Sequence, residues 1–361
     1  MVAIQGDRGA RRPRVLIVGA GFAGLRALRA LQGKCDVTIV DFDYCILCAG
    51  SEYPDAALKA RPVAQSAEQR EAEWRARSTE LRDASSVCII GGGTTGVELA
   101  AELADVRRPG TTTLVSSTAR LLQHMPEKAG RYAQGHLERR GVRVLLGQRV
   151  VEGGVRGGVL ETDAGTRVDA DVVVRCVGVR VQVAPGGVVE VANERDAGRW
   201  SGLPVDECLV VRTATRQEGG PVIFAAGDQA DTPFPRTAFT ADLMADAAAE
   251  NVMRHWRGKP LRRFPSETTS YGRSWLPAIE CVSLGKSRGV LQMGGLVMTG
   301  LLPSVSKDGM EATLVGCSRG GTVWNAVWSV AEPASVWLVC RMLPLLGLGQ
   351  PAAQRVTWGG R

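Results

Sequence analysis

Histidine is scarce in this chain of 361 residues, and its scarcity narrows the chemistry that the chain can perform. The three histidines, His124, His136 and His255, are well separated in sequence and lack the spacing of metal ligands. No arrangement of serine, histidine and aspartate indicates a hydrolytic triad. The sequence therefore does not indicate a triad hydrolase or a histidine-bound metal site.

The chain also lacks long apolar runs. The longest, Ser335–Gly349, contains Arg341 and Pro344 and is too short to cross a membrane. Residues 1–13 carry charges but no apolar segment of a signal peptide. No nucleic-acid motif, fixed-period repeat or low-complexity tract is visible. We expect an intracellular, cytoplasmic protein that binds no nucleic acid, with peripheral membrane contact left open.

Nine cysteines lie scattered through apolar runs, and their odd number indicates reduced, buried thiols. Cys45 and Cys48 have the spacing of a redox dithiol. They fall in a strand-like run, residues 42–49, in which side chains three positions apart point to opposite faces. We therefore expect no disulfide between them, which argues against a disulfide reductase.

The composition allows two or three domains with hydrophobic cores, because 45% of the residues are hydrophobic. The net charge is +7, and basic residues cluster at positions 8–14 and 254–263. Such a surface suits anionic lipid or phosphate-bearing cofactors. A plain solvated basic surface is the alternative.

Two G-x-G-x-x-G motifs are the most informative feature that is present. The first consists of Gly19, Gly21 and Gly24, and the second of Gly91, Gly93 and Gly96. Each follows an apolar run and opens an Ala/Leu-rich stretch, which is the strand–turn–helix context of a dinucleotide-binding loop. The first glycine allows the tight turn, the second admits the pyrophosphate, and the third lets helix and strand pack closely. Two such loops predict a flavin and a nicotinamide cofactor, unless one copy has lost its ligand.

Polar residues at strand ends extend both motifs. Asp41 lies 22 residues after Gly19, where an acid binds the adenosine ribose, although a plain strand-end aspartate is the alternative. The strand at residues 112–115 ends in Ser116 and Ser117, with Arg120 nearby. Hydroxyls and a cation at this position can bind the 2′-phosphate of NADPH. Alternatively, they allow both NADPH and NADH to bind.

A third strand end is also informative, because the apolar residues 221–226 lead into Gly227 and Asp228. Ligands bind at the carboxyl ends of strands in open α/β sheets. Asp228 is placed to accept a hydrogen bond from a ribityl hydroxyl, and Gly227 lets the backbone approach a flavin pyrophosphate. An ordinary aspartate in a turn is the alternative.

Apolar periodicity predicts the remaining elements. Helices are expected at residues 25–32, 64–81, 96–105, 132–140 and 238–256, and strands at 14–18, 36–40, 87–90, 112–115, 142–146, 171–177 and 221–226. Residues 152–168 and 269–310 have the turn-rich pattern of β-structure.

One junction conflicts with this order, because Asp41 runs directly into the strand-like residues 42–49. Two neighbouring parallel strands need a crossover of about a dozen residues. Residues 37–48 must therefore form one long strand, form a bent strand, or mark the place of a missing segment.

The order of these features along the chain resembles that in FAD-dependent pyridine nucleotide oxidoreductases. The features are the two glycine motifs, Asp41, the Ala49–Ser51 turn, Glu98, Gly178 and the run Phe224–Asp228. Residues 96–103 and 283–289 are most similar to the ferroptosis suppressor and apoptosis-inducing-factor-like branch. Type II NADH dehydrogenases are its relatives. The resemblance covers roughly residues 13–330.

The resemblance implies an α/β fold with two Rossmann-like dinucleotide-binding domains and a small α+β C-terminal domain. The expected segments are residues 13–84 and 183–262 for FAD, 85–182 for NAD(P)H, and 263–361 for the C-terminal domain. It also implies hydride transfer from NAD(P)H to FAD and then electron transfer to a quinone. Gly50 and Gly178 would then contact cofactors.

Two charged residues receive a role from the same resemblance. Glu98 would lie near the nicotinamide, although a glutamate in the first turn of a helix is also favoured by the helix dipole. Arg236 would lie near the flavin and stabilise its anionic reduced form. A surface arginine at a helix entry is the alternative for Arg236.

The chain departs from this family after Asp41, where family members carry many tens of additional residues. The alternative function is therefore a truncated, non-catalytic protein that binds NAD(P) but holds flavin poorly. The expected partner is a small quinone or another electron acceptor. Residues 334–349 are a candidate for membrane docking, with burial or a dimer face as alternatives, and the oligomeric state stays open.

Overall fold

The structure is a computed structural model that describes residues 13, 15–18, 22–31, 35, 42–53, 55, 58, 66–106, 110–151, 158–178, 180–181, 202–212, 220–265, 279–318, 322–323 and 326–327. The chain divides into two compact units. Unit 1 comprises Met1–Ser51, Arg180–Leu276 and Ala353–Arg361, and unit 2 comprises Glu52–Val179 and Pro277–Ala352. The second glycine motif and the C-terminal sheet share unit 2, so the expected division into three domains stays a prediction.

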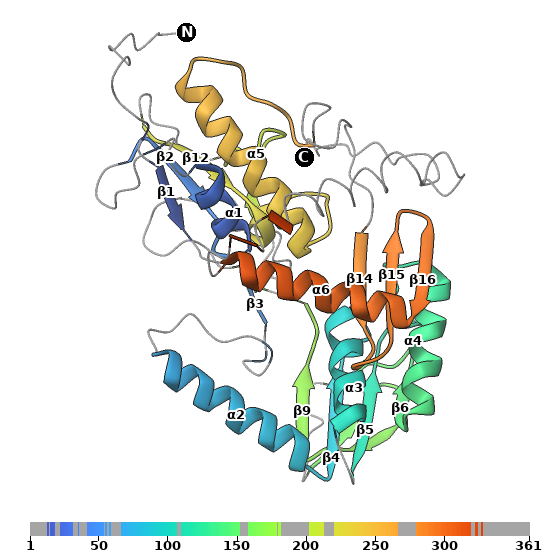
Figure 1. Cartoon of the computed structure of the whole chain (residues 1–361). Helices are drawn as coiled ribbons and strands as arrows, with labels where there is room; N and C mark the ends of the chain where they lie inside the picture. Colours follow the sequence, from blue (N-terminus) through green and yellow to red (C-terminus); the bar gives the residue numbers. More distant parts are fainter. Residues whose placement is uncertain are drawn as a thin grey trace. The chain divides into compact units, whose positions relative to one another are not determined.

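Unit 1 is built on a parallel sheet with the strand order β1-β2-β12 (Figure 1). The strands are β1 (Val15–Val18), β2 (Tyr44–Leu47) and β12 (Val222–Ala225). Every residue of β2 is buried, as expected of a middle strand in a parallel sheet. Two helices, α1 (Phe22–Leu31) and α5 (Ala238–Trp256), pack against each other beside this sheet.

The position of β2 bears on the predicted conflict after Asp41. β2 pairs in parallel with β1 through Val15 and Tyr44, and with β12 through Val222 and Tyr44. Phe42 and Asp43 precede β2 outside any strand, so one unbroken strand over residues 37–48 is wrong. Residues 36–41 lie outside the described residues. Within the strand-like run at 42–49, only β2 is a strand, and it is the middle strand of its own sheet.

Short elements complete unit 1 and mark the unit boundaries. A 3-10 turn, η1 (Gly227–Gln229), follows β12, and β11 (Leu203–Pro204) pairs in parallel with β13 (Ala230–Asp231). Two further short strands, β3 (Ser51–Glu52) and β10 (Arg180–Val181), lie where the chain passes from one unit to the other.

Unit 2 contains a second, four-stranded parallel sheet with the order β6-β5-β4-β9. Its strands are β4 (Ser86–Ile90), β5 (Thr111–Val115), β6 (Val142–Leu145) and β9 (Val172–Arg175). The helices α3 (Thr94–Val106) and α4 (Glu127–Arg139) connect them, and β7 (Val159–Glu161) and β8 (Arg167–Asp169) form an antiparallel pair. This strand–helix alternation confirms the second Rossmann-like unit. The helix predicted at 132–140 begins five residues earlier, directly after Pro126.

An antiparallel sheet follows in unit 2, formed by β14 (Ile279–Ser283), β15 (Gly289–Met293) and β16 (Leu296–Gly300). It shares one hydrophobic core with the parallel sheet, because Val282 and Val290 belong to the same buried cluster as Ile89 and Leu114. The expectation of β-structure up to residue 310 is wrong, since α6 (Leu301–Ser318) begins directly after β16. Pro303 lies in the first turn of α6, where a missing N–H costs no hydrogen bond.

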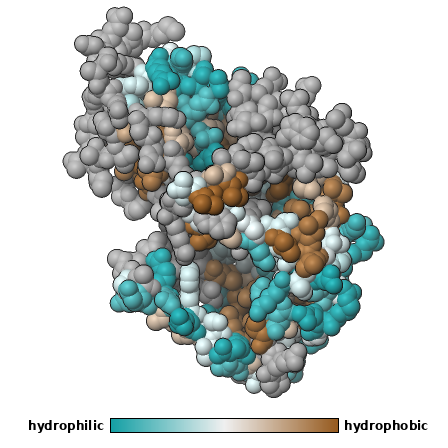
Figure 2. Space-filling view, viewed as in Figure 1, coloured by the Kyte–Doolittle hydropathy of each residue, from teal (hydrophilic) through white to brown (hydrophobic). Residues whose placement is uncertain are grey.

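The polar helix predicted at 64–81 is α2 (Ala67–Asp83) in unit 2. Ser66 caps it: the Ser66 hydroxyl accepts from the backbone N–H of Gln69 at 3.2 Å, and the Gln69 side chain accepts from the Ser66 N–H at 2.9 Å. Most of its exposed side chains are charged or polar and contribute to the hydrophilic surface in Figure 2. Within the described ranges, no helix has the length and apolar content needed to cross a membrane.

Candidate dinucleotide-binding sites

A cavity of about 740 Å³ lies in unit 2 at the carboxyl ends of the parallel strands. Its wall is formed by residues 90–93, 115–118, 148–151 and 175–178, together with Gln123, His124 and Asp163. Cofactor sites typically enclose about 300–1,000 Å³ and lie at this edge of an α/β sheet. The cavity is therefore large enough and correctly placed for a dinucleotide.

The second glycine motif forms one wall of the cavity, and its three glycines are distinguished by their surroundings. Gly91 has a φ of +122°, and a Cβ there would lie 2.5 Å from the carbonyl oxygen of Cys176. A Cβ at Gly96 would lie well under 3.0 Å from the carbonyl oxygen of Gly91. A Cβ at Gly93 would meet nothing within 4 Å, so only this position opens toward a ligand. These surroundings agree with the turn, approach and packing roles expected of the motif.

Ser116 and Ser117 line the cavity at the end of β5, where the sequence places them. The Ser116 hydroxyl is buried and lies 2.8 Å from the Thr118 hydroxyl. Arg120 is not among the lining residues, because its guanidinium donates to the carbonyl oxygens of Leu122 at 3.1 Å and Gln123 at 2.6 Å. The cavity thus gives no support to a cofactor contact by Arg120, while a contact by Ser116 stays a prediction.

Sequence reasoning missed two cavity arginines, Arg149 and Arg175, and the acid Asp163. Arg149 follows β6 and Arg175 ends β9. The signal that would have found them is the rule that the carboxyl ends of all parallel strands meet at one edge. Gly178, which the sequence singles out, also lines the cavity and has a φ of +73°.

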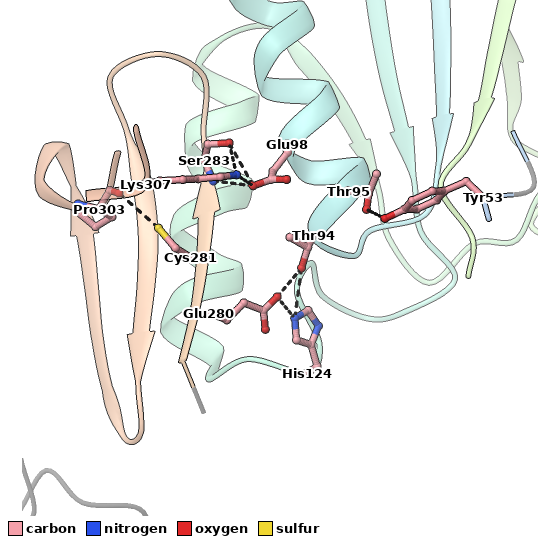
Figure 3. A network of polar contacts seen from close by, with 10 residues as sticks. All are labelled: Tyr53, Thr94, Thr95, Glu98, His124, Glu280, Cys281, Ser283, Pro303 and Lys307. Atoms are coloured by element: carbon pink, nitrogen blue, oxygen red, sulfur yellow. Dashed lines mark hydrogen bonds and ion pairs between the residues drawn. The ribbon is translucent and has the colours of Figure 1, made fainter. Parts of the chain in front are cut away.

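Glu98 lies beyond the first turn of α3 and faces the C-terminal sheet and α6 (Figure 3). One of its oxygens, Oε1, accepts hydrogen bonds from the Ser283 N–H at 3.0 Å and the Ser283 hydroxyl at 3.1 Å, and it also pairs with the Lys307 ammonium. The interpretation of Glu98 as a first-turn residue favoured by the dipole is therefore wrong. Glu98 does not line the cavity, and its proximity to a nicotinamide stays a prediction.

A second polar cluster joins the cavity rim to β14 (Figure 3). Glu280 Oε1 accepts from the Thr94 hydroxyl at 2.6 Å and lies 2.9 Å from His124 Nε2, and His124 lines the cavity. Burial alone would raise the pKa of Glu280, but the bonds from His124 and Thr94 outweigh it and hold that pKa below its usual range. Glu280 is thus an anion held beside the opening of α3.

Three cysteines near the candidate sites, Cys45, Cys48 and Cys176, lack the properties of a redox-active thiol. Cys45 and Cys48 are both free and buried, as the strand argument predicts. Burial raises the pKa of each thiol to about 12. The pKa of Cys176, which lines the cavity, is also raised to about 12 by burial and by the neighbouring Asp55. At neutral pH these groups are protonated and poor nucleophiles.

In unit 1, the turns after β2 and β12 meet. The Ser51 hydroxyl donates to Asp228 Oδ2 at 2.6 Å, and the Ala49 N–H donates to Gln229 Oε1 at 2.8 Å. Gly50 and Gly227 both have a φ of +73°, a conformation that favours glycine. The structure thus brings Gly50, Gly227 and Asp228 together, as expected of parts of one site.

Arg236 lines a small pocket with Gly227 and Asp228, and its Nε donates to the carbonyl oxygen of Asp228 at 3.3 Å. Gly24 is buried within α1. Gly19, Gly21 and Asp41 lie outside the described residues, so their expected contacts with FAD stay predictions.

Two curated relatives and one solved structure give the comparison. The chain is 27% identical to ferroptosis suppressor protein 1 of Taeniopygia guttata, across 63% of this chain and 59% of the relative. It is 26% identical to the Homo sapiens protein of the same name, across 81% and 74%. A NAD-dependent persulfide reductase from A. fulgidus has a TM-score of 0.51 at 17% identity, across 77% and 63%.

These matches have defined limits. The chain spans about three fifths of the Taeniopygia guttata protein and of the persulfide reductase. The structural match shows a shared α/β fold, as the sequence predicts. Residues 34–249 match the family described as pyridine nucleotide-disulphide oxidoreductase, whose members use FAD and NAD(P)H, the cofactor pair expected from the glycine motifs. The chain therefore belongs to the pyridine nucleotide-disulphide oxidoreductase family.

Proposed function

We propose that the protein is an FAD-dependent NAD(P)H oxidoreductase that reduces a quinone-type acceptor. The observation that carries this proposal is the cavity of about 740 Å³ that Gly91, Gly92 and Gly93 of the second glycine motif line. In the proposed reaction, a hydride passes from NAD(P)H to FAD and the electrons then pass to the acceptor.

The residues around the cavity fit a dinucleotide. Gly93 leaves one wall without a side chain, and the first turn of α3 directs backbone N–H groups and the positive end of its dipole to the same place. Ser116 offers a hydroxyl at the end of β5, where a carboxylate would repel a 2′-phosphate. Gly178, which follows β9, lines the same cavity. These residues would bind and orient NAD(P)H.

The residues of unit 1 fit a flavin nucleotide in the same way. Gly50 and Gly227 supply the positive φ of two adjoining turns, and the Ser51 hydroxyl donates to the Asp228 carboxylate and holds it in place. Arg236 is fixed to the backbone of Asp228, which directs a cation toward the same pocket. We assign Asp228 to a ribityl hydroxyl and Arg236 to the anionic reduced flavin.

The experiment that tests the proposal begins with the colour of the purified full chain. A flavoprotein absorbs near ~450 nm because of its bound cofactor. NADPH and NADH should bleach this band anaerobically, and a short-chain quinone should restore it. Asp228→Asn should lower the flavin content, while Asp163→Asn, a change in unit 2, should not. Bleaching without reoxidation by quinone would leave the acceptor assignment without support.

The alternative, a dinucleotide-binding protein that holds flavin poorly, has one observation in its favour. Only residues 32–43 separate α1 from β2, where a flavin domain has further structure by resemblance. A colourless protein that still binds NADPH would favour this alternative. The membrane contact proposed for residues 334–349 falls outside the described residues, and liposome co-sedimentation of the full chain and of a chain ended after Glu332 tests it.

A further inference from the structure

We infer that Arg149 is the residue that recognises the 2′-phosphate of NADPH, an inference that rests on the proposed binding of NAD(P)H to the unit 2 cavity. Arg149 lines this cavity, and Arg120, which the sequence favours, does not. The two arginines follow different strands: Arg120 comes after β5, and Arg149 comes after β6.

The sheet order places Arg149 beside the expected position of the adenosine ribose. In a Rossmann-type unit the ribose lies at the end of the second strand, which is β5 here. β6 is the outer neighbour of β5, whereas β9 lies on the far side of β4. Arg149 therefore adjoins the ribose end of the cavity, and Arg175, at the end of β9, adjoins the glycine loop.

Backbone hydrogen bonds hold the segment of Arg149 against the loop after β5. The Gln148 N–H donates to the Ser116 carbonyl at 3.0 Å, and the Gly147 N–H donates to the Thr118 carbonyl at 2.9 Å. These bonds join the two loops that form this wall. A side chain on the second loop therefore reaches the same space as the hydroxyls on the first.

The backbone of Arg149 is fixed from the other side as well. Its N–H donates to Asp163 Oδ1 at 2.8 Å, and its carbonyl accepts from the Asp163 N–H at 2.8 Å. No ion pair or hydrogen bond of the Arg149 guanidinium exists among the residues that the structure describes. The guanidinium thus remains available on a rigid backbone, while Arg120 already binds two carbonyl oxygens.

The charges on this wall suit a phosphate monoester. Ser116, Ser117, Thr118 and Gln148 are uncharged, and the carboxylate that lines the cavity, Asp163, already accepts a bond from the Arg149 backbone. An arginine binds a phosphate through two parallel N–H bonds, which are stronger than bonds between neutral groups. The wall therefore discriminates NADPH from NADH through one side chain.

The test measures nucleotide binding to the full chain, with 2′,5′-ADP and 5′-AMP as probes. Arg149→Ala should weaken the binding of 2′,5′-ADP about ten- to hundredfold, which is the loss expected for a charge-assisted phosphate contact. It should change the affinity for 5′-AMP by less than about twofold. Arg149→Lys should recover part of the loss. In steady-state kinetics, Arg149→Ala should raise the KM for NADPH without raising the KM for NADH.

Three arginines serve as controls. Arg120→Ala should affect both probes equally or not at all, and so should Arg175→Ala. Arg143, exposed on β6 and absent from the cavity wall, reports the effect of removing one positive charge. If Arg149→Ala weakens both probes equally, or neither, the inference is overturned while the proposed function stands. If the unaltered chain binds neither probe and no NADH, both fail.

Discussion

Two glycines of the second motif should respond differently to an added methyl group: Gly96 in stability and Gly93 in nucleotide affinity. At Gly96 the new Cβ of Gly96→Ala would lie well under 3.0 Å from the backbone carbonyl of Gly91. At Gly93 the new Cβ of Gly93→Ala would meet nothing within 4 Å. The first change strains the fold, and the second places a methyl group where the pyrophosphate is expected to approach.

The magnitudes follow from the surroundings. Overpacking costs about 1–3 kcal/mol, and Gly96→Ala belongs at the upper end because backbone atoms obstruct the methyl group. Alanine in a helix regains about 1 kcal/mol over glycine, so we expect a net loss of about 2 kcal/mol in the free energy of unfolding. For a unit of 150–250 residues this lowers Tm by about 4–8 °C. Gly93→Ala should change the free energy of unfolding by no more than about 0.5 kcal/mol. It should weaken the binding of NADPH about tenfold or more.

The assay pairs thermal unfolding with a fluorescence titration of NADPH on the same preparations. Gly96→Ala should lose stability, and Gly93→Ala should lose affinity at an unchanged Tm. If Gly93→Ala destabilises the protein as much as Gly96→Ala, the opening at Gly93 is not the reason for its glycine. If Gly93→Ala binds NADPH as the parent does, the dinucleotide does not lie against this loop.

Three further outcomes can be measured. Lys307→Ala leaves the partly buried Glu98 carboxylate without its cation and should cost about 2 kcal/mol in urea unfolding, with partial recovery in Lys307→Arg; a loss below about 0.5 kcal/mol would mean a solvated pair. Burial and neighbouring arginines lower the pKa of His136, so the unfolded chain takes up the proton first. Stability should therefore fall as the pH drops below about 6.5, and less so in His136→Gln, by Tm against pH. Cys45 and Cys48, with pKa values raised to about 12 by burial, should resist Ellman's reagent until the chain unfolds; labelling of the folded chain in a mass spectrum would refute this.

Local patterns predicted the elements that position the site. An apolar run followed by glycine predicted the turn after β4, because the positive φ of Gly91 is a local requirement. The carbonyl of Cys176, which leaves no room for a Cβ at Gly91, is distant in sequence. The bounds of α5 also agree with the pattern. The sequence failed at α6, where Pro303 and Gly309 have low helix propensity. Packing of α6 against β14–β16 overrides that preference.

The partners of charged side chains could not be predicted. Arg120 was favoured because it is near β5 in sequence, yet its own loop supplies carbonyl oxygens that bind the guanidinium first. Arg149 reaches the same wall through the pairing of β6 with β5, which is a non-local contact. Glu98 binds Ser283 and Lys307, which are 185 and 209 residues away. No window of sequence contains such pairs.

The two polar clusters of unit 2 connect the glycine loop to the C-terminal sheet. Thr94 and Glu98 are four residues apart and therefore share one face of α3, and both bind residues of β14, namely Glu280 and Ser283. A ligand that stabilises the opening of α3 should stabilise these contacts as well. We expect NADPH to slow amide hydrogen exchange in residues 279–283 as well as in residues 91–93. Protection confined to the glycine loop would show that the C-terminal sheet does not sense the cavity.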